Sequence, residues 1–186
     1  MKILLISGAR NPNGQTSKAA DALLRGASNA GAMVEHILLP TLKIERCRQC
    51  EANGWGLCHA EGHCVIEDDF AAVKERIRAA DLLVFATPVY YGDLAESLRG
   101  YLDRLRRTCT HEAGQVGIKG KPAVGLCVAC GGGGGAPWCC VSIERALAST
   151  GFDVIDLIPA RRQNLAMKVQ MLEVVGRWLA NYEAVH

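Results

Sequence analysis

Short apolar runs alternate with amphipathic stretches along the whole chain. The apolar runs are bounded by turn residues and span residues 2–7, 33–39, 81–87, 122–128 and 152–158. Runs of this length and continuity are typical of strands buried on both faces. Apolar residues recur at helical spacing over 19–27, 70–80, 94–105, 142–150 and 165–182. This alternation of strand and helix predicts an α/β fold in which helices cover both faces of a parallel sheet.

Turn and capping residues mark where these elements should begin and end. The expected helix N-caps are Thr16 or Ser17, Asp68 and Asp93, and the expected C-terminal stops are Gly31 and Gly151. The segment 40–67 has no clear period and is expected to form one long irregular insertion after the second strand. We see no internal repeat or linker, so we expect residues 1–186 to form a single domain.

The composition narrows the classes of partner. The formal charge is +2, and the longest basic run, 104–107, is broken by Leu105, so nothing indicates binding to nucleic acid or an anionic membrane. No stretch approaches membrane-spanning length, and Gly8 and Arg10 interrupt the first apolar run too early for a signal peptide. We therefore expect a cytoplasmic protein whose partners are small molecules or proteins.

The first loop, "SGARNPNGQTSK", does not fit two common nucleotide motifs. It lacks the G-x-G-x-x-G of dinucleotide-binding units, and no acidic residue ends the second strand. It also lacks the Gly-Lys-Ser/Thr of NTPase phosphate loops. A polar loop that runs into a helix N-terminus favours an anion, and a monophosphate would suit it. A tight turn with an N-cap explains the same residues equally well.

Two further loops should lie beside this one. The third strand leaves through "TPVYYGD", which offers two aromatic faces, and the fourth leaves through "CGGGGGAPW". In a parallel sheet the loops after strands one, three and four share the carboxyl edge, where ligands bind. A flexible loop is the alternative for the glycines, but their entropic cost favours close approach to a ligand. A phosphate site, an aromatic turn and a wall without side chains predict FMN.

Three motifs in this order resemble one known family. "SGARNPNGQTSK", "GHCVIEDDF" and "TPVYYGDLAESLRGYLDR" are similar to the flavodoxin-like NAD(P)H-dependent FMN reductases, and within them to the iron–sulfur flavoprotein branch, from residue 2 to about 160. The resemblance implies a doubly wound five-stranded parallel sheet of order 2-1-3-4-5 with a Cys-rich insertion after strand 2. It also implies bound FMN, homodimers or homotetramers, and electrons from NAD(P)H or a protein donor.

The same resemblance implies the cofactor-binding residues. The phosphate would be held by Arg10, Asn13, Gln15, Thr16 and Ser17. The ring system would be enclosed by Pro88, Val89, Tyr90, Tyr91, Gly92, Asp93, Gly131, Gly132, Gly133 and Gly134. The family often has serine where this chain has Ala9, so one phosphate ligand is either missing or supplied by Ser7. No side chain is expected to be catalytic, because the flavin carries the chemistry.

Four cysteines in the insertion form the second candidate site. Cys47, Cys50, Cys58 and Cys64 are a donor set that suits either an iron–sulfur cluster or a tetrahedral zinc ion. In iron–sulfur flavoproteins the third cysteine follows two residues after the second, whereas here seven residues intervene. The inserted 54–56, Gly-Trp-Gly, could return Cys58 to the others. We rank an iron–sulfur cluster first and keep zinc or free thiols as alternatives.

The remaining cysteines carry weaker signals. Cys127 and Cys130 form a C-x-x-C, but Cys127 lies in a predicted core strand, so we interpret the pair as structural. Cys139 and Cys140 stand at a predicted helix start, where the dipole could make one thiol reactive.

Two functions fit these features. The first is an FMN-dependent enzyme that passes electrons from NAD(P)H to a quinone, a flavin or another small acceptor. The second is an electron carrier whose cluster takes electrons from a ferredoxin-like donor. A flavin-binding sensor without turnover is a weaker third hypothesis.

Overall fold

Five parallel strands form the central sheet of the computed structural model, which describes residues 1–183; residues 184–186 of the predicted domain lie outside the described part. The strands are β1 (Lys2–Ser7), β2 (Met33–Leu38), β3 (Leu82–Pro88), β4 (Pro122–Ala129) and β5 (Asp153–Arg161). They pair in the order β2-β1-β3-β4-β5, and every pairing is parallel. The predicted fold class and strand order are confirmed.

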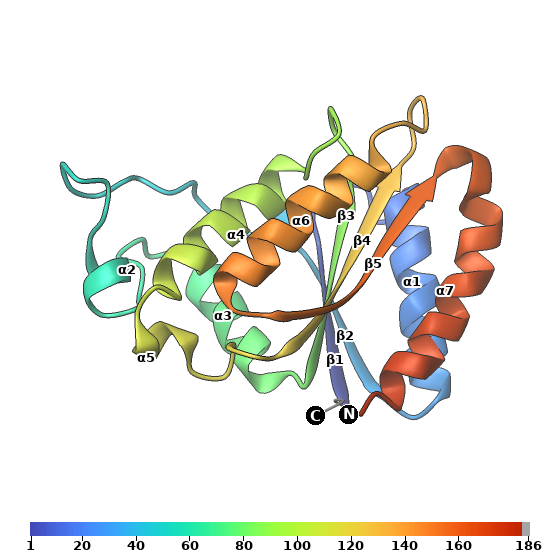
Figure 1. Cartoon of the computed structure of the whole chain (residues 1–186), viewed down its shortest axis with the longest axis horizontal. Helices are drawn as coiled ribbons and strands as arrows, with labels where there is room; N and C mark the ends of the chain where they lie inside the picture. Colours follow the sequence, from blue (N-terminus) through green and yellow to red (C-terminus); the bar gives the residue numbers. More distant parts are fainter. Residues whose placement is uncertain (184–186) are drawn as a thin grey trace.

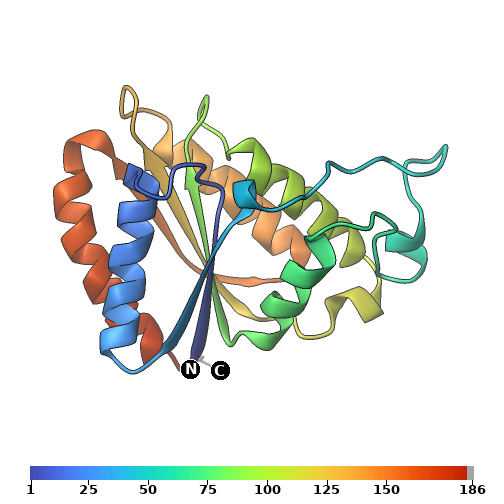
Figure 2. The same ribbon diagram turned by 180° about the vertical axis from the view of Figure 1, so that it is seen from behind.

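Helices cover both faces of the sheet (Figure 1). One face carries α1 (Gln15–Asn29) and α7 (Leu165–Ala180), and the other carries α3 (Phe70–Ala79), α4 (Glu96–Thr108) and α6 (Ala136–Thr150), as the reverse view also shows (Figure 2). Each layer buries its own apolar cluster against the strands. α1 and α7 approach closely because both carry glycine at the contact: an added Cβ on Gly26 would lie 2.1 Å from the Glu173 carbonyl oxygen.

The C-terminal ends of the helices follow the predictions better than the N-terminal ends. Gly31 and Gly151 have φ of +90° and +104°, the left-handed conformation that ends a helix, as predicted. Asp68 accepts a hydrogen bond from the Phe70 N–H at 3.1 Å, so it caps the start of α3 although Asp69 directly precedes the helix.

Two predicted N-caps are wrong. The N-cap of α1 is Gly14, so Thr16 lies inside the first turn, and the N-cap of α4 is Ala95, two residues after Asp93. α6 begins at Ala136, six residues before the predicted start. The short helices η1 (Leu39–Thr41), α2 (Leu57–Ala60), α5 (Glu112–Gln115) and η2 (Arg162–Asn164) were not predicted. They are too short to show a period.

The insertion after β2 leaves the carboxyl edge of the sheet and extends beyond α4 to α2 (Figure 1). It returns across α5, where an added Cβ on Gly62 would lie 2.5 Å from the backbone nitrogen of Gly114. The predicted irregular segment is therefore confirmed, apart from the single turns η1 and α2. Among residues 1–183 no helix has the length and apolar character needed to cross a membrane.

Candidate cofactor site

The loop after β1 leads directly into the N-terminus of α1. Gly14 occupies the N-cap position, and no side chain hydrogen-bonds the first turn from there. Thr16 and Ser17 follow inside this turn and are only 4% and 1% exposed. An uncapped helix start attracts an anion, because its backbone N–H groups and its dipole both favour negative charge.

Asn11 holds this loop in shape, and the sequence alone did not indicate it. Its side-chain Oδ1 accepts a hydrogen bond from the Asn13 N–H at 2.9 Å. Its carbonyl oxygen accepts from the Gly14 N–H at 3.0 Å and from the Ser17 hydroxyl at 2.8 Å. Asn13 and Ser17 thus contribute to the shape of the loop.

Ser7 ends β1 beneath the loop, and Gly8 follows it. Ser7 is fully buried, and its hydroxyl accepts a hydrogen bond from the Ala9 N–H at 3.1 Å. Gly8 packs against α4, where an added Cβ would lie 3.0 Å from the Cβ of Leu98. Ser7 therefore supports the loop from within the protein, and its assignment to the phosphate stays a prediction.

The turn after β3 is held in an unusual backbone conformation. Tyr90 and Asp93 exchange two backbone hydrogen bonds of 3.0 and 2.9 Å around Tyr91 and Gly92, whose φ values are +52° and +78°. Tyr91 is fully exposed, and within residues 1–183 it shares a positive φ with just one other non-glycine residue, Gln49. Such a conformation costs on the order of 1–3 kcal/mol and is concentrated at functional sites.

The glycine run 131–135 packs against this turn. An added Cβ on Gly135 would lie 2.8 Å from the Cα of Gly92, and one on Gly133 would lie 2.1 Å from the side chain of Gln163. Gln163 also donates a hydrogen bond to the backbone of the run at 3.2 Å. Close packing within the protein therefore requires glycine at two of these positions, and the predicted close approach of the run to a ligand stays a prediction.

Two adjoining cavities lie among these loops. The loop cavity has a volume of about 350 Å³ and the outer cavity about 580 Å³, and Arg10, Val89 and Tyr90 line both. The loop cavity also includes the predicted residues Gln15, Thr16, Pro88 and Gly131, and the outer cavity adds Tyr91. The other predicted residues lie around the cavities without lining either one: Ser7, Asn13, Ser17, Gly92, Asp93, Gly132, Gly133 and Gly134.

Several lining residues were not predicted. The loop cavity includes Ala9, Asn11, Gly14, Val128 and Cys130, and the outer cavity includes Gly8, Pro40, Ala95, Glu96 and Ser97. Pro40 could have been found, because it follows the second strand and so belongs to the same carboxyl edge. The start of α4 could not, since its distance from the loops depends on how the helix packs.

Asp93 stabilises the aromatic turn from the side. Its carboxylate accepts a hydrogen bond from the Leu94 N–H at 2.7 Å and pairs with the Arg99 guanidinium. Burial opposes ionisation, but the hydrogen bond from Leu94 and the charge of Arg99 hold the pKa of Asp93 below its ordinary value. Asp93 therefore stays ionised and holds the turn in place.

The four cysteines of the insertion line one small cavity of about 20 Å³. Gly56 makes this arrangement feasible: an added Cβ there would lie 3.1 Å from the Cβ of Cys50, so the loop returns closely enough to bring Cys58 beside it. All four thiols are free. Within residues 1–183 no three Cys, His, Asp or Glu side chains converge closely enough to hold one metal ion. The donors suit a metal–thiolate centre, but a single ion would require them to move together.

This cysteine cavity lies beside α4, away from the carboxyl edge from which the insertion leaves the sheet. It is lined by Arg104 and Arg107 near the end of α4, whereas the outer cavity is lined by Glu96 at its start. At a rise of about 1.5 Å per residue, the two places are roughly 12–17 Å apart along the helix.

The other cysteines lie in the core or at its edge. Cys127 is fully buried and packs under α6, whereas Cys130 lines the loop cavity, so the C-x-x-C does not form a pair. Cys139 and Cys140 lie early in α6 and are 0% and 7% exposed. Hydrogen bonding with Cys127 lowers the pKa of Cys140. Cys140 therefore remains the candidate for a reactive thiol, with little access to solvent.

A doubly wound sheet of order 2-1-3-4-5, with its ligand site at the carboxyl edge, defines the flavodoxin-like class. Within that class the chain belongs to a particular family of oxidoreductases. Residues 1–140 match the NADPH-dependent FMN reductases. The resemblance inferred from the sequence motifs is thereby confirmed.

Individual relatives add detail. An iron–sulfur flavoprotein of Archaeoglobus fulgidus is 33% identical over 105 residues, which cover 56% of this chain and 46% of that protein. The chain spans about half the length of the curated relatives it matches. Among solved structures, a flavone reductase has a TM-score of 0.69 and 26% identity, covering 97% of this chain and 62% of that one. The match to an NAD(P)H:quinone oxidoreductase from Methanothermobacter marburgensis has a TM-score of 0.73 and 20% identity, and it covers 100% of this chain and 99% of that one. This match shows the shared fold.

Proposed function

We propose that this chain binds FMN and transfers electrons from NADPH or NADH to a quinone, a flavin or another small acceptor. The observation that carries the proposal is the loop cavity, which joins the uncapped start of α1 to the aromatic turn and the glycine run. Gln15 and Thr16 suit a phosphate, and Tyr90 and Gly131 suit a flat ring.

FMN, when bound, supplies hydride acceptance and the transfer of one or two electrons. The residues of this chain bind and orient it: the α1 N-terminus holds the anion, and Val89 and Tyr90 line both the loop cavity and the outer cavity. The outer cavity, with Arg10 on its wall, offers space for a nicotinamide or an acceptor beside the flavin.

The first experiment measures cofactor content and reduction. The purified protein should be yellow with about one FMN per chain, and NADPH or NADH should bleach the flavin within seconds under anaerobic conditions. Protein that neither contains FMN nor quenches the fluorescence of added FMN would refute the proposed cofactor. Bleaching by dithionite or reduced ferredoxin alone would favour the electron carrier over the enzyme.

The electron-carrier function is a second candidate because four cysteines share one cavity along α4. We propose that Cys47, Cys50, Cys58 and Cys64 bind one iron–sulfur cluster. A cluster bound through several irons tolerates wider sulfur separations than a zinc ion, whose Zn–S bonds of about 2.3 Å place the sulfurs close together. Anaerobic protein should contain iron and acid-labile sulfide, and Cys50→Ser should lose both while keeping FMN. One zinc ion per chain, without iron or sulfide, would instead indicate a structural zinc site.

We also propose that the protein works in the cytoplasm as a homodimer or homotetramer. Nine free thiols suit a reducing compartment. Tyr91 is fully exposed and Trp138 is 74% exposed, which supports contact with a second copy over the flavin site. Light scattering should report a dimer or tetramer, and Trp138→Glu should shift it toward the monomer. A wild-type monomer at all concentrations would refute this assignment.

A further inference from the structure

The cysteine cavity is bordered by positive charge. Arg48, Arg104 and Arg107 line it together with the four cysteines. Lys74 is buried close by, where it donates hydrogen bonds to the Gly62 carbonyl at 3.1 Å and to the Thr108 hydroxyl at 2.8 Å. No carboxylate in the described part of the chain pairs with this lysine within salt-bridge distance. Arg104 and Arg48 pair with Asp68 and Glu45. The excess of positive charge beside the cavity therefore comes from Lys74 and from Arg107, which also pairs with no carboxylate within residues 1–183.

Arg104 is the most deeply buried of the arginines. Its side chain is 1% exposed and forms an ion pair with Asp68, whose side chain is fully buried. The two nitrogens Nη1 and Nη2 bind the two carboxylate oxygens at 2.6 and 3.0 Å. The guanidinium also packs over Phe70, 4.3 Å from the ring centroid. This geometry fixes the orientation of the side chain.

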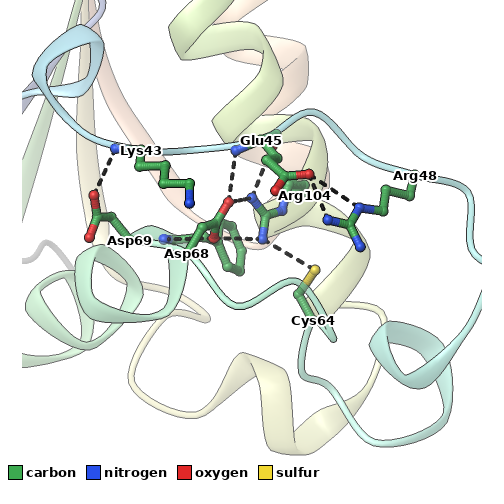
Figure 3. A network of polar contacts seen from close by, with 8 residues as sticks. Lys43, Glu45, Arg48, Cys64, Asp68, Asp69 and Arg104 are labelled. Carbon is green, nitrogen blue, oxygen red and sulfur yellow. Dashed lines mark hydrogen bonds and ion pairs between the residues drawn. The ribbon is translucent and has the colours of Figure 1, made fainter.

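Nη1 and Nη2 of Arg104 also reach the insertion (Figure 3). Nη1 donates to the Glu45 carbonyl at 2.9 Å, and Nη2 donates to the Cys64 Sγ at 3.3 Å. Asp68 in turn accepts the Glu45 N–H at 2.7 Å. One buried ion pair thus holds both ends of the cysteine segment, before Cys47 and at Cys64.

Arg107 holds the middle of the same segment. Its guanidinium donates to the Gly54 carbonyl and lies 4.2 Å from the ring centroid of Trp55. Arg106, the neighbouring residue on α4, faces the opposite side and lines a cleft with Arg145 of α6. These two neighbouring residues of α4 therefore face different surfaces: Arg107 faces the cysteine segment, and Arg106 faces the cleft beside α6.

We propose that Arg104 and Arg107 are positioning residues that set the charge around the metal centre and raise its reduction potential. The proposal rests on the cluster in the proposed function. Four thiolates around an iron–sulfur core leave a net negative charge, and an added electron increases it. A fixed guanidinium that donates to a ligand sulfur stabilises the reduced form more than the oxidised one. Arg104 does this through Cys64, and Arg107 through its charge at the cavity wall.

The test compares neighbouring arginines. Arg107→Met, Arg107→Lys and the control Arg106→Met would be purified anaerobically, and iron, sulfide and the potential of the centre would be measured by spectroscopic redox titration. Arg107→Met should lower the reduction potential of the centre. At a fixed solution potential, the ratio of reduced to oxidised centre should fall about tenfold, which corresponds to about 59 mV for one electron. Arg107→Lys should shift it less, and Arg106→Met should leave it unchanged.

A double variant tests Arg104 without leaving a buried charge unpaired. Arg104→Met with Asp68→Asn removes one positive and one negative charge together, so it should bind FMN normally and lower the potential of the centre through the lost hydrogen bond to Cys64, by less than Arg107→Met. If this variant unfolds, the Arg107 comparison still decides. Equal potentials in Arg107→Met and Arg106→Met, with iron retained, overturn this proposal alone. Wild-type protein that holds zinc or no metal overturns the cluster and this proposal together.

Discussion

Replacing Thr16 by valine would remove one hydroxyl from the loop cavity while preserving the shape of the side chain. Thr16 is 4% exposed and lies in the uncapped first turn of α1. If its hydroxyl donates to the phosphate of FMN, the loss is that of one hydrogen bond to a charged group, about 1.5–3 kcal/mol. The dissociation constant should then rise roughly 13- to 160-fold.

Titration of the stripped protein with FMN, followed by quenching of flavin fluorescence, measures this change. Riboflavin lacks the phosphate, so its affinity should be the same for wild type and Thr16→Val. Thr150→Val is the matched control, because Thr150 is also buried, at 2% exposure, but lies at the end of α6. Equal FMN affinity in Thr16→Val and wild type would remove Thr16 from the phosphate site, and equal losses for FMN and riboflavin would show damage to the loop.

Three further predictions concern stability. Tyr101→Phe should raise the free energy of unfolding in urea by about 1–3 kcal/mol, because the buried Tyr101 hydroxyl has no hydrogen-bond partner among residues 1–183; a loss would reveal a partner. Gly26→Ala should lower it by about 1–3 kcal/mol through the collision of α1 with α7, whereas Gly100→Ala, with open space at its Cβ, should raise it by about 0.5–1 kcal/mol. Similar effects of Gly26→Ala and Gly100→Ala would contradict the close packing of α1 against α7. Burial lowers the pKa of His36 despite the opposing charge of Asp21, so folding favours the neutral imidazole. The contribution of His36 to the free energy of unfolding should therefore be full above the pKa of the unfolded chain, about 6.5, and should decrease as the pH falls below that value. His36→Gln should reduce the change of the free energy of unfolding with pH, measured by urea unfolding at several pH values. An unchanged dependence on pH would exclude His36 as its source.

The sequence by itself determined the elements and the edge at which the ligand site lies. Continuous apolar runs and helical periods depend on neighbouring residues, so the strands and their alternation with helices could be predicted. Gly31 and Gly151 ended their helices as predicted because their left-handed conformation is a local property. The order of the strands was predicted from the family resemblance. The shared carboxyl edge of parallel strands then brought the first loop, the aromatic turn and the glycine run together.

Only the tertiary structure decided which side chains reach the cavities. Pro40 and Glu96 line the outer cavity because α4 and the end of β2 pack beside the first loop. The return of Cys58 depends on the contact between Gly56 and Cys50. The pairing of Arg104 with Asp68 joins residues 36 positions apart. Such contacts combine distant segments through packing, and no local period or propensity encodes the distance between them.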